Sequence, residues 1–327
     1  MIASFDFSMN NSIRMKPNQN IVLFALILMG CGSNSSSTLS SSSQQSETPT
    51  SLISSSNVVS ESSNVQFYES ILYGNDPRQI LELAHRKDVI NPQPAVLFIH
   101  GGSWIGGDKA IMRRYRDLVL DNGYIYVSMN YRFITSGADY LDMLDDITLA
   151  LTFLSDYAND LMINPEKIAL VGESAGAHLA TLYAYRNKST SPIEVSFVMA
   201  MVPPVDFTDP AFITYGDPTL QLFLANGLMG TSIEGPESLA SSGYPASWLD
   251  ASPISHLDKA IPTLVAYAGM DELIPISNME RFIEQANEFN APVETIFFEN
   301  SGHSLSADPD KLALLLSTFI LRLNQYL

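Results

Sequence analysis

The chain has 327 residues, of which 46% are hydrophobic and 16% charged, so it can build a full-sized core, and wholesale disorder is excluded. Its 35 acidic residues outnumber 17 lysines and arginines, and a net charge of -18 repels phosphate backbones, which argues against nucleic acid as a partner. A single cysteine, Cys31, excludes a disulfide framework and a cysteine-rich zinc site.

The N-terminal segment has the layout of a secretory signal peptide. An apolar run, IVLFALILMG at 21–30, is only about half as long as a membrane-spanning helix. Arg14 and Lys16 precede the run, and small residues follow it. We therefore expect residues 1–30 to be a signal peptide, with Met1 and Met15 both candidate start residues.

The run ends in LMGC at 28–31, which resembles a bacterial lipobox, the motif whose cysteine is acylated after cleavage. This resemblance implies a lipid anchor on Cys31 and a place in the cell envelope. Gly32 is not the aspartate that retains lipoproteins at the inner membrane, which favours the outer membrane or cell surface. Of residues 33–63, 16 are serine, so residues 31–63 are predicted to be a lipidated, flexible tether. The globular domain is then 64–327.

Apolar runs and helical periodicity alternate along this domain. Strands are predicted at 65–73, 79–86, 95–100, 125–129, 168–171, 195–201, 263–268 and 293–298. Helices are predicted at 110–121, 141–160, 175–186, 278–289 and 311–326. The alternation predicts an α/β fold with a mostly parallel sheet and helices on both faces, whose sites form at the carboxyl ends of strands. Residues 206–255 break the pattern and are predicted to be a small insertion over the site.

The sequence GESAG at 172–176 directly follows a buried strand and opens a helix, which is the context of a nucleophile elbow. The flanking glycines allow a sharp turn that exposes Ser174 at the edge of the sheet. Serine is a weak nucleophile and needs a base that a third group orients. Ser174 is therefore the predicted nucleophile.

Three histidines follow Ser174 in the chain, and an α/β-hydrolase places its acid between the serine and the histidine. His178 lies on the same helix as Ser174, and His256 precedes the good acid candidates. His303, in a polar loop after the strand at 293–298, is the predicted base.

Asp271 is the predicted acid, because it follows the strand at 263–268 on a loop. Its neighbour Glu272 is a rival, and Asp258 is a weaker one. Either rival would also lie between the serine and the histidine.

An oxyanion hole is predicted after the strand at 95–100, where the chain reads HGGSW at 100–104. The N–H groups of Gly102 and Ser103, with that of Ala175, would stabilise the negative charge on the substrate oxygen. Trp104 is expected to form a bulky wall of the substrate pocket. The insertion adds further aromatic residues and no long apolar helix is expected in it, so the sequence predicts a preference for short acyl groups. Those aromatic residues are Phe212, Tyr215, Phe223, Tyr244 and Trp248.

Together these motifs resemble the α/β-hydrolase superfamily, in the esterase and lipase group with an HGG-type oxyanion loop. The matching segments are HGGSW at 100–104, NYR at 130–132, GESAGAHLA at 172–180, GMDELIP at 269–275 and SGH at 301–303. The resemblance implies hydrolysis of a small-molecule carboxylic ester through an acyl-enzyme on Ser174, without cofactor or metal. Ser103 stands where many relatives have a third glycine, and His100 resembles the histidine that shapes the oxyanion loop.

Two alternatives remain open from the sequence. HGG-x-W with G-x-SAGAHL also resembles kynurenine formamidases, which cleave a formamide with the same machinery, although an exported enzyme would not meet that cytosolic metabolite. The other alternative is a non-catalytic binding module on a hydrolase scaffold, but such modules commonly lose a member of the triad. The sequence indicates neither the natural ester nor the oligomeric state.

Overall fold

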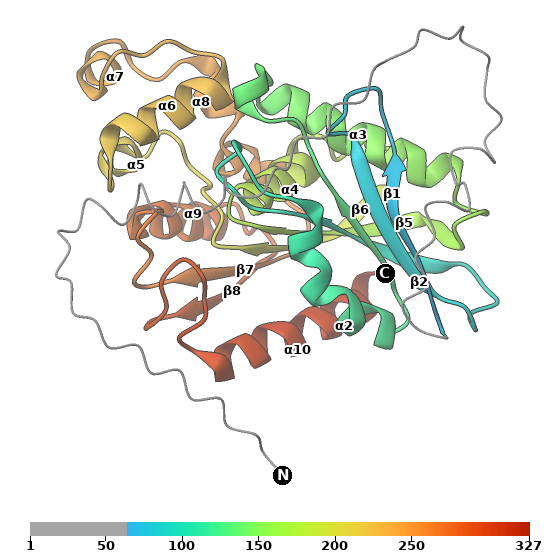
Figure 1. Ribbon diagram of the computed structural model, residues 1–327. Helices are drawn as coiled ribbons and strands as arrows, with labels where there is room; N and C mark the ends of the chain where they lie inside the picture. The colour runs from blue at the N-terminus through green and yellow to red at the C-terminus, as the bar shows by residue number, and fades with distance from the viewer. Residues whose placement is uncertain (1–63) are drawn as a thin grey trace, which may run out of the picture. The chain divides into compact units, whose positions relative to one another are not determined.

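The computed structural model describes residues 64–327 (Figure 1). The signal peptide predicted over residues 1–30, the lipidation site Cys31 and the serine-rich segment lie outside the described residues. Those predictions therefore stay predictions.

An eight-stranded sheet forms the centre of the domain, in the order β1-β2-β4-β3-β5-β6-β7-β8. The pairs β1/β2 and β2/β4 are antiparallel, and every other neighbouring pair is parallel. This arrangement confirms the predicted α/β-hydrolase architecture. The strands are β1 Val65–Leu72, β2 Ile80–Arg86, β3 Gln93–Ile99, β4 Ile125–Met129, β5 Ile163–Glu173, β6 Glu194–Met201, β7 Thr263–Ala268 and β8 Val293–Phe298.

Helices cover both faces of the sheet (Figure 1). One apolar cluster joins the sheet to α3, α4 and α9, and a second joins its other face to α2 and α10. These helices are α2 Arg116–Asp121, α3 Tyr140–Asp156, α4 Ala175–Arg186, α9 Ile276–Glu288 and α10 Pro309–Tyr326. In α10, Leu315, Phe319 and Leu323 are buried at a spacing of four residues, which is the repeat of one helix face.

Some predicted bounds were wrong for local reasons. Residues 110–121 were predicted as one helix, but a 3-10 helix, η3 Lys109–Tyr115, precedes α2. Helix α3 begins at Tyr140 because Asp139 and Asp142 form a capping box there, and it ends at Asp156 rather than at residue 160. The strands β4, β7 and β8 have the predicted bounds.

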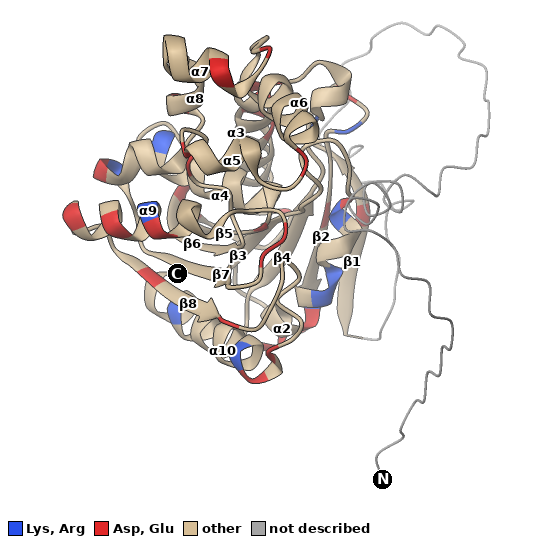
Figure 2. Cartoon of the chain, turned by 90° about the vertical axis from the view of Figure 1, so that its left-hand side faces the viewer, with Lys and Arg blue, Asp and Glu red and all other residues tan. Residues whose placement is uncertain are grey.

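The insertion at 206–255 is more helical than its composition suggests. It contains α5 Pro210–Thr214, α6 Pro218–Met229, α7 Pro236–Ser242, α8 Ala246–Asp250 and the start of the 3-10 helix η5 Pro253–Lys259. In α5, α6 and α7 the first helical residue is a proline, a position where its missing N–H costs nothing. Prolines that resemble loop residues in the sequence thus start helices here. The four α-helices lie together on one side of the sheet (Figures 1 and 2).

The charge of the domain is visible on its helices. Acidic residues outnumber basic ones along α9, where Glu280, Glu284 and Glu288 accompany one arginine, Arg281 (Figure 2). Within residues 64–327, no helix has both the length and the hydropathy that a transmembrane span requires.

Candidate active site

Ser174 occupies a strained turn between β5 and α4. Its φ is 52° and its ψ is -119°, a conformation that costs a non-glycine residue free energy. A Cβ atom on Gly172 would lie 2.2 Å from the carbonyl oxygen of Gly176. A Cβ atom on Gly176 would lie 2.1 Å from that of Ile99, on the neighbouring strand. The two glycines of the motif are therefore required by close backbone packing.

His303 joins Ser174 to Asp271 through hydrogen bonds at both ring nitrogens. Its Nε2 lies 2.8 Å from the Ser174 Oγ, and its Nδ1 lies 2.8 Å and 3.0 Å from the two carboxylate oxygens of Asp271. An ionised carboxylate only accepts hydrogen bonds, so Nδ1 carries the hydrogen. The unprotonated Nε2 then accepts from the serine hydroxyl, which leaves the ring ready to take that proton.

The two rival acids at the end of β7 face different parts of His303. Asp271 is buried, and its Oδ1 also accepts from the backbone N–H groups of Leu273 (2.9 Å) and Ile274 (3.0 Å). Glu272 instead accepts from the backbone N–H of His303 at 3.1 Å. Asp271 thus orients the ring, and Glu272 holds the loop that carries it. Asp258, the weaker rival, is an exposed residue of η5.

Ser301 fixes the loop that presents His303, a contact that the sequence did not indicate. Ser301 is fully buried, and its hydroxyl donates to Asp308 at 2.9 Å. Its carbonyl accepts from the N–H of Met270 at 3.0 Å, which ties this loop to the one that carries Asp271.

Three consecutive residues of the predicted oxyanion loop have a left-handed backbone, with φ of 126° at Gly102, 53° at Ser103 and 59° at Trp104. Glycine adopts this region without strain, which explains why a glycine suits the position of Ser103. Within residues 64–327, the N–H groups of Gly102 and Ser103 donate to no protein acceptor. Ala175, the first residue of α4, has a helix-start N–H that is likewise available for an anion.

This loop lies against the nucleophile. A Cβ atom on Gly101 would be 3.2 Å from the Cβ of Ser174. The free N–H groups therefore lie close to the place where a substrate carbonyl would approach Ser174.

The NYR segment at 130–132 closes the loop at both ends, a role that its sequence alone does not show. The Tyr131 hydroxyl donates to the carbonyl of His100 at 3.0 Å. The Asn130 side chain accepts from the N–H of Lys109 at 2.6 Å and donates to Asp108 at 3.0 Å.

Trp104, the predicted pocket wall, is only 4% exposed. Its ring nitrogen donates to the Nδ1 of His178 at 3.2 Å, and the His178 Nε2 donates to the carbonyl of Ala251 at 2.8 Å. The indole and the Phe207 ring form a T-shaped pair, with 5.9 Å between ring centroids. Complete burial lowers the pKa of His178 to about 4, so this ring is a neutral structural group.

The aromatic residues of the insertion differ in burial, and Tyr244 is partly buried. Phe212 and Trp248 are buried in the core, whereas Phe223 is 54% exposed. Tyr215 is partly buried and donates its hydroxyl to the carbonyl of Asp271 at 2.6 Å. A second bond, from the side-chain amide of Gln221 to the carbonyl of Leu273 at 3.2 Å, also joins the insertion to the acid loop. The insertion is thus attached directly to the loop of the predicted acid.

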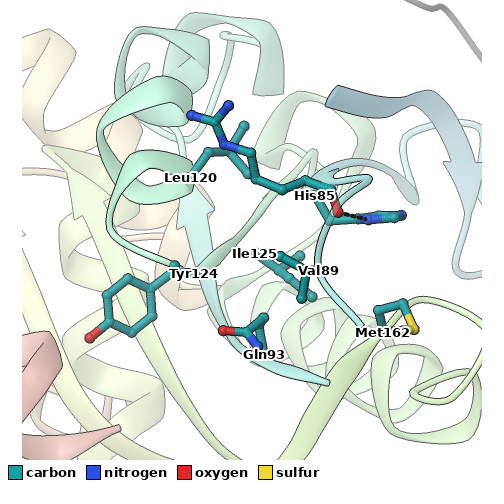
Figure 3. Close-up of a pocket in the computed structure, with 9 residues that line it drawn as sticks. His85, Val89, Gln93, Leu120, Tyr124, Ile125 and Met162 are labelled. Atoms are coloured by element: carbon teal, nitrogen blue, oxygen red, sulfur yellow. Dashed lines mark hydrogen bonds between the residues drawn. The ribbon is translucent and has the colours of Figure 1, made fainter. Parts of the chain in front are cut away.

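A small cavity at the other end of the sheet does not belong to this site (Figure 3). It lies beside Gln93, Ile125 and Met162, near the amino ends of β3, β4 and β5, and encloses only about 10 Å³. That volume is near the minimum for one water molecule. No group of three or more His, Cys, Asp or Glu side chains in residues 64–327 is arranged to hold a metal ion.

Comparison with known proteins gives consistent matches. The model of the BD-FAE family matches residues 81–285. A "Probable isoprenylcysteine alpha-carbonyl methylesterase" of Arabidopsis thaliana is 25% identical over 241 residues, which are 72% of this chain and 50% of the relative. Esterase LipC of Mycobacterium tuberculosis is 28% identical over 234 residues, 66% of this chain and 54% of the relative. The chain therefore spans about half the length of these relatives.

Among solved structures, esterase B of Lactobacillus rhamnosis superposes with a TM-score of 0.62 at 19% identity, covering 80% of this chain and 88% of the other. Esterase 2 of Thermogutta terrifontis gives 0.60 at 19% identity, covering 79% and 93%. At this identity the superpositions establish the fold.

Proposed function

Because the chain belongs to the BD-FAE family, an esterase family with the α/β-hydrolase fold, we propose that it hydrolyses carboxylic esters with Ser174 as nucleophile. The observation that carries this proposal is the unbroken hydrogen-bond chain from the Ser174 hydroxyl through His303 to Asp271. The esterase names of the relatives support the same reaction class.

In the acylation step, the Oγ of Ser174 attacks the ester carbonyl while the Nε2 of His303 takes its proton. The carbonyl oxygen becomes an oxyanion, which the N–H groups of Gly102, Ser103 and Ala175 stabilise. Asp271 keeps the ring in the required tautomer and stabilises its positive charge. His303 then gives the proton to the leaving alcohol, and the acyl group remains on Ser174.

In the deacylation step, His303 takes a proton from a water molecule, which attacks the acyl-enzyme. The same N–H groups stabilise the second oxyanion. The carboxylic acid leaves, and the proton returns from His303 to Ser174.

We further propose that the preferred acyl groups are short, from acetyl to butyryl. Trp104 is almost completely buried beside the predicted oxyanion loop, which supports a restricted pocket. The hydrogen bonds that attach the insertion to the loop of Asp271 support it as well. The extra methylene groups of a longer acyl chain add little binding free energy once such a pocket is full.

The direct test uses the purified domain, residues 64–327, with a series of p-nitrophenyl esters and with N-formylkynurenine. Ester turnover, together with labelling of Ser174 by a fluorophosphonate probe, is the expected result. Turnover of the formamide with negligible ester hydrolysis would identify a formamidase instead. A folded protein that the probe does not label would favour the non-catalytic binding module.

For the whole chain we propose attachment to the cell envelope through a lipid on Cys31, at the outer membrane or the cell surface. This proposal depends on the sequence at 14–32 alone.

A further inference from the structure

Arg78, in the turn before β2, contacts both ends of the oxyanion loop although it lies more than 20 residues before it in the chain. Its Nη2 lies 3.3 Å from the Nε2 of His100, where the loop begins, and 3.3 Å from the carbonyl oxygen of Gly107, where it ends. Its Nε donates to the carbonyl of Tyr131 at 3.2 Å, and its guanidinium carbon lies 3.8 Å from the ring centre of Phe133. Four contacts therefore fix one guanidinium group.

The contacts of His100 determine which of its nitrogens carries the hydrogen. Its Nδ1 lies 2.7 Å from the carbonyl oxygen of Gly101, which only accepts, so Nδ1 must donate. A guanidinium group only donates, so the Nε2 that faces Arg78 must accept. The two contacts are compatible only with a neutral ring that is protonated at Nδ1.

The environment of His100 keeps the ring neutral. The ring is completely buried and stacks on Tyr131 with 4.5 Å between centroids. Burial, together with the positive charges of Arg78 and Lys109, lowers the pKa of His100 to about 4, against the opposing effects of the hydrogen bond to Gly101 and of Asp108.

The tautomer of His100 sets the direction of a predicted oxyanion donor. In a trans peptide, the carbonyl and the following N–H point to opposite sides. The Gly101–Gly102 peptide is trans, and its carbonyl points to His100, so the Gly102 N–H points away from His100. In the other tautomer, an unprotonated Nδ1 would repel this carbonyl and favour rotation of the peptide.

Gly107, at the end of the loop, packs too closely on His100 for any side chain to fit there. A Cβ atom on Gly107, which has a φ of 103°, would lie 2.5 Å from the Nδ1 of His100 and 2.4 Å from the carbonyl oxygen of Gly101. Gly107 thus packs directly against the hydrogen bond between the His100 ring and the Gly101 carbonyl.

We propose that Arg78 is a positioning residue for catalysis, which holds His100 in the Nδ1-protonated tautomer and thereby keeps the Gly102 N–H turned toward the substrate oxygen. This inference depends on the proposed ester hydrolysis for its catalytic consequence. Its structural part, the tautomer of His100, is independent of any activity.

The kinetic test compares Arg78→Met with Arg78→Lys in the purified full chain. The methionine removes every donor, and kcat should fall roughly 10- to 100-fold with KM within about twofold, because the oxyanion donor acts mainly in the transition state. The lysine keeps one charged donor and should recover part of kcat. Arg322→Met is a matched control. Arg322, on α10, forms an ion pair with Glu294 on β8, and its substitution should leave kcat unchanged.

The spectroscopic test measures the ring-nitrogen resonances of His100 in 15N-histidine-labelled protein, assigned with a His100→Gln variant. The wild-type spectrum should show a protonated Nδ1 and an unprotonated Nε2, and Arg78→Met should change this pattern while circular dichroism shows a folded chain. An unchanged kcat or an unchanged tautomer in folded Arg78→Met would overturn the proposal. If Arg78→Met does not fold, the wild-type spectrum still tests the proposal, because a His100 ring protonated at Nε2 would overturn it.

The two proposals can fail separately. If the wild-type protein hydrolyses no ester, the proposed function fails, while the tautomer measurement still decides whether Arg78 controls His100. If esters are hydrolysed and Arg78→Met is as fast as wild type, only the role of Arg78 fails.

Discussion

The predicted oxyanion loop at 100–108 presents backbone N–H groups beside Ser174, whereas the loops at 269–275 and 300–305 present hydrogen-bonded side chains to it. In the first region, three left-handed residues direct the backbone, and buried groups such as Asn130 and Tyr131 hold the ends of the loop. In the second, Asp271 and Glu272 bind different parts of His303 through direct hydrogen bonds.

The difference suggests how each region should respond to substitution. A backbone donor cannot be removed by changing its own side chain, so the oxyanion loop is sensitive to the residues that support it. A side-chain relay can be broken one group at a time.

The largest decrease in kcat is expected at Ser174, which lies beside both regions. Ser174→Ala removes the nucleophile, and kcat should fall on the order of a millionfold in assays with p-nitrophenyl butyrate. Thermal unfolding should show no loss of stability, because alanine removes only the hydroxyl. A variant that keeps more than a hundredth of wild-type kcat would place the nucleophile elsewhere.

The next effect separates the two neighbouring carboxylates. Asp271→Asn should lower kcat by about 10⁴-fold, because the amide stabilises the wrong tautomer of His303 and carries no charge. Glu272→Gln keeps an acceptor for the backbone N–H of His303 and should lower kcat only severalfold. A larger effect at Glu272 than at Asp271 would reverse the assignment.

Much of this arrangement could be predicted from the sequence because its determinants are local. GESAG follows its strand directly, and β4 and β7 are short, mostly apolar runs, so their positions are evident without tertiary information. The triad candidates could be ordered by their places along the chain.

The unpredicted features depend on contacts between distant segments. Arg78 lies 22 residues from His100, and Tyr215 lies 56 residues from Asp271. The helices of the insertion were missed because proline at a first helical position has the same local signature as proline in a loop. The role of NYR likewise becomes visible only when β4 lies beside β3 in the sheet.

A third prediction tests the packing beside the oxyanion loop. Trp104→Ala should destabilise the domain by about 3–5 kcal/mol, because it opens a cavity and leaves His178 without its donor. The same change should raise octanoyl relative to butyryl ester turnover in kcat/KM. Phe319→Ala is the matched control, since Phe319 is also buried but belongs to α10, in the apolar cluster on the other face of the sheet. An equal shift in that control would mean that general loosening, not the pocket wall, changes selectivity.

A fourth prediction uses the buried histidines next to this loop. His100 and His178 have pKa values near 4 because they are buried, against about 6.5 in an unfolded chain. Between pH 4 and 6.5 the unfolded chain binds protons that the folded chain does not, so stability is greatest above pH 6.5 and falls as the pH decreases. Each histidine contributes up to about 3 kcal/mol to this fall.

Urea unfolding at several pH values measures that slope directly. His178→Gln should reduce the pH dependence in this range, whatever its effect on absolute stability. Thr181→Val, on the same helix, removes no titratable group and should leave the slope unchanged. A slope that is the same in all three proteins would show that His178 is not the group that titrates.

The smallest effect on catalysis is expected from a change outside both regions. Cys31→Ser should leave kcat and KM unchanged, because all the contacts described around Ser174 lie within residues 64–327. It should, however, move the protein from the membrane fraction to the soluble fraction and abolish incorporation of a labelled fatty acid, since a thiol is the group that the lipobox acylates. Ser33→Ala, two residues further on, is the matched control and should stay in the membrane fraction. If Cys31→Ser remains in the membrane fraction as completely as this control, the anchor is not a lipid on Cys31, and the apolar run at 21–30 would have to hold the chain in some other way.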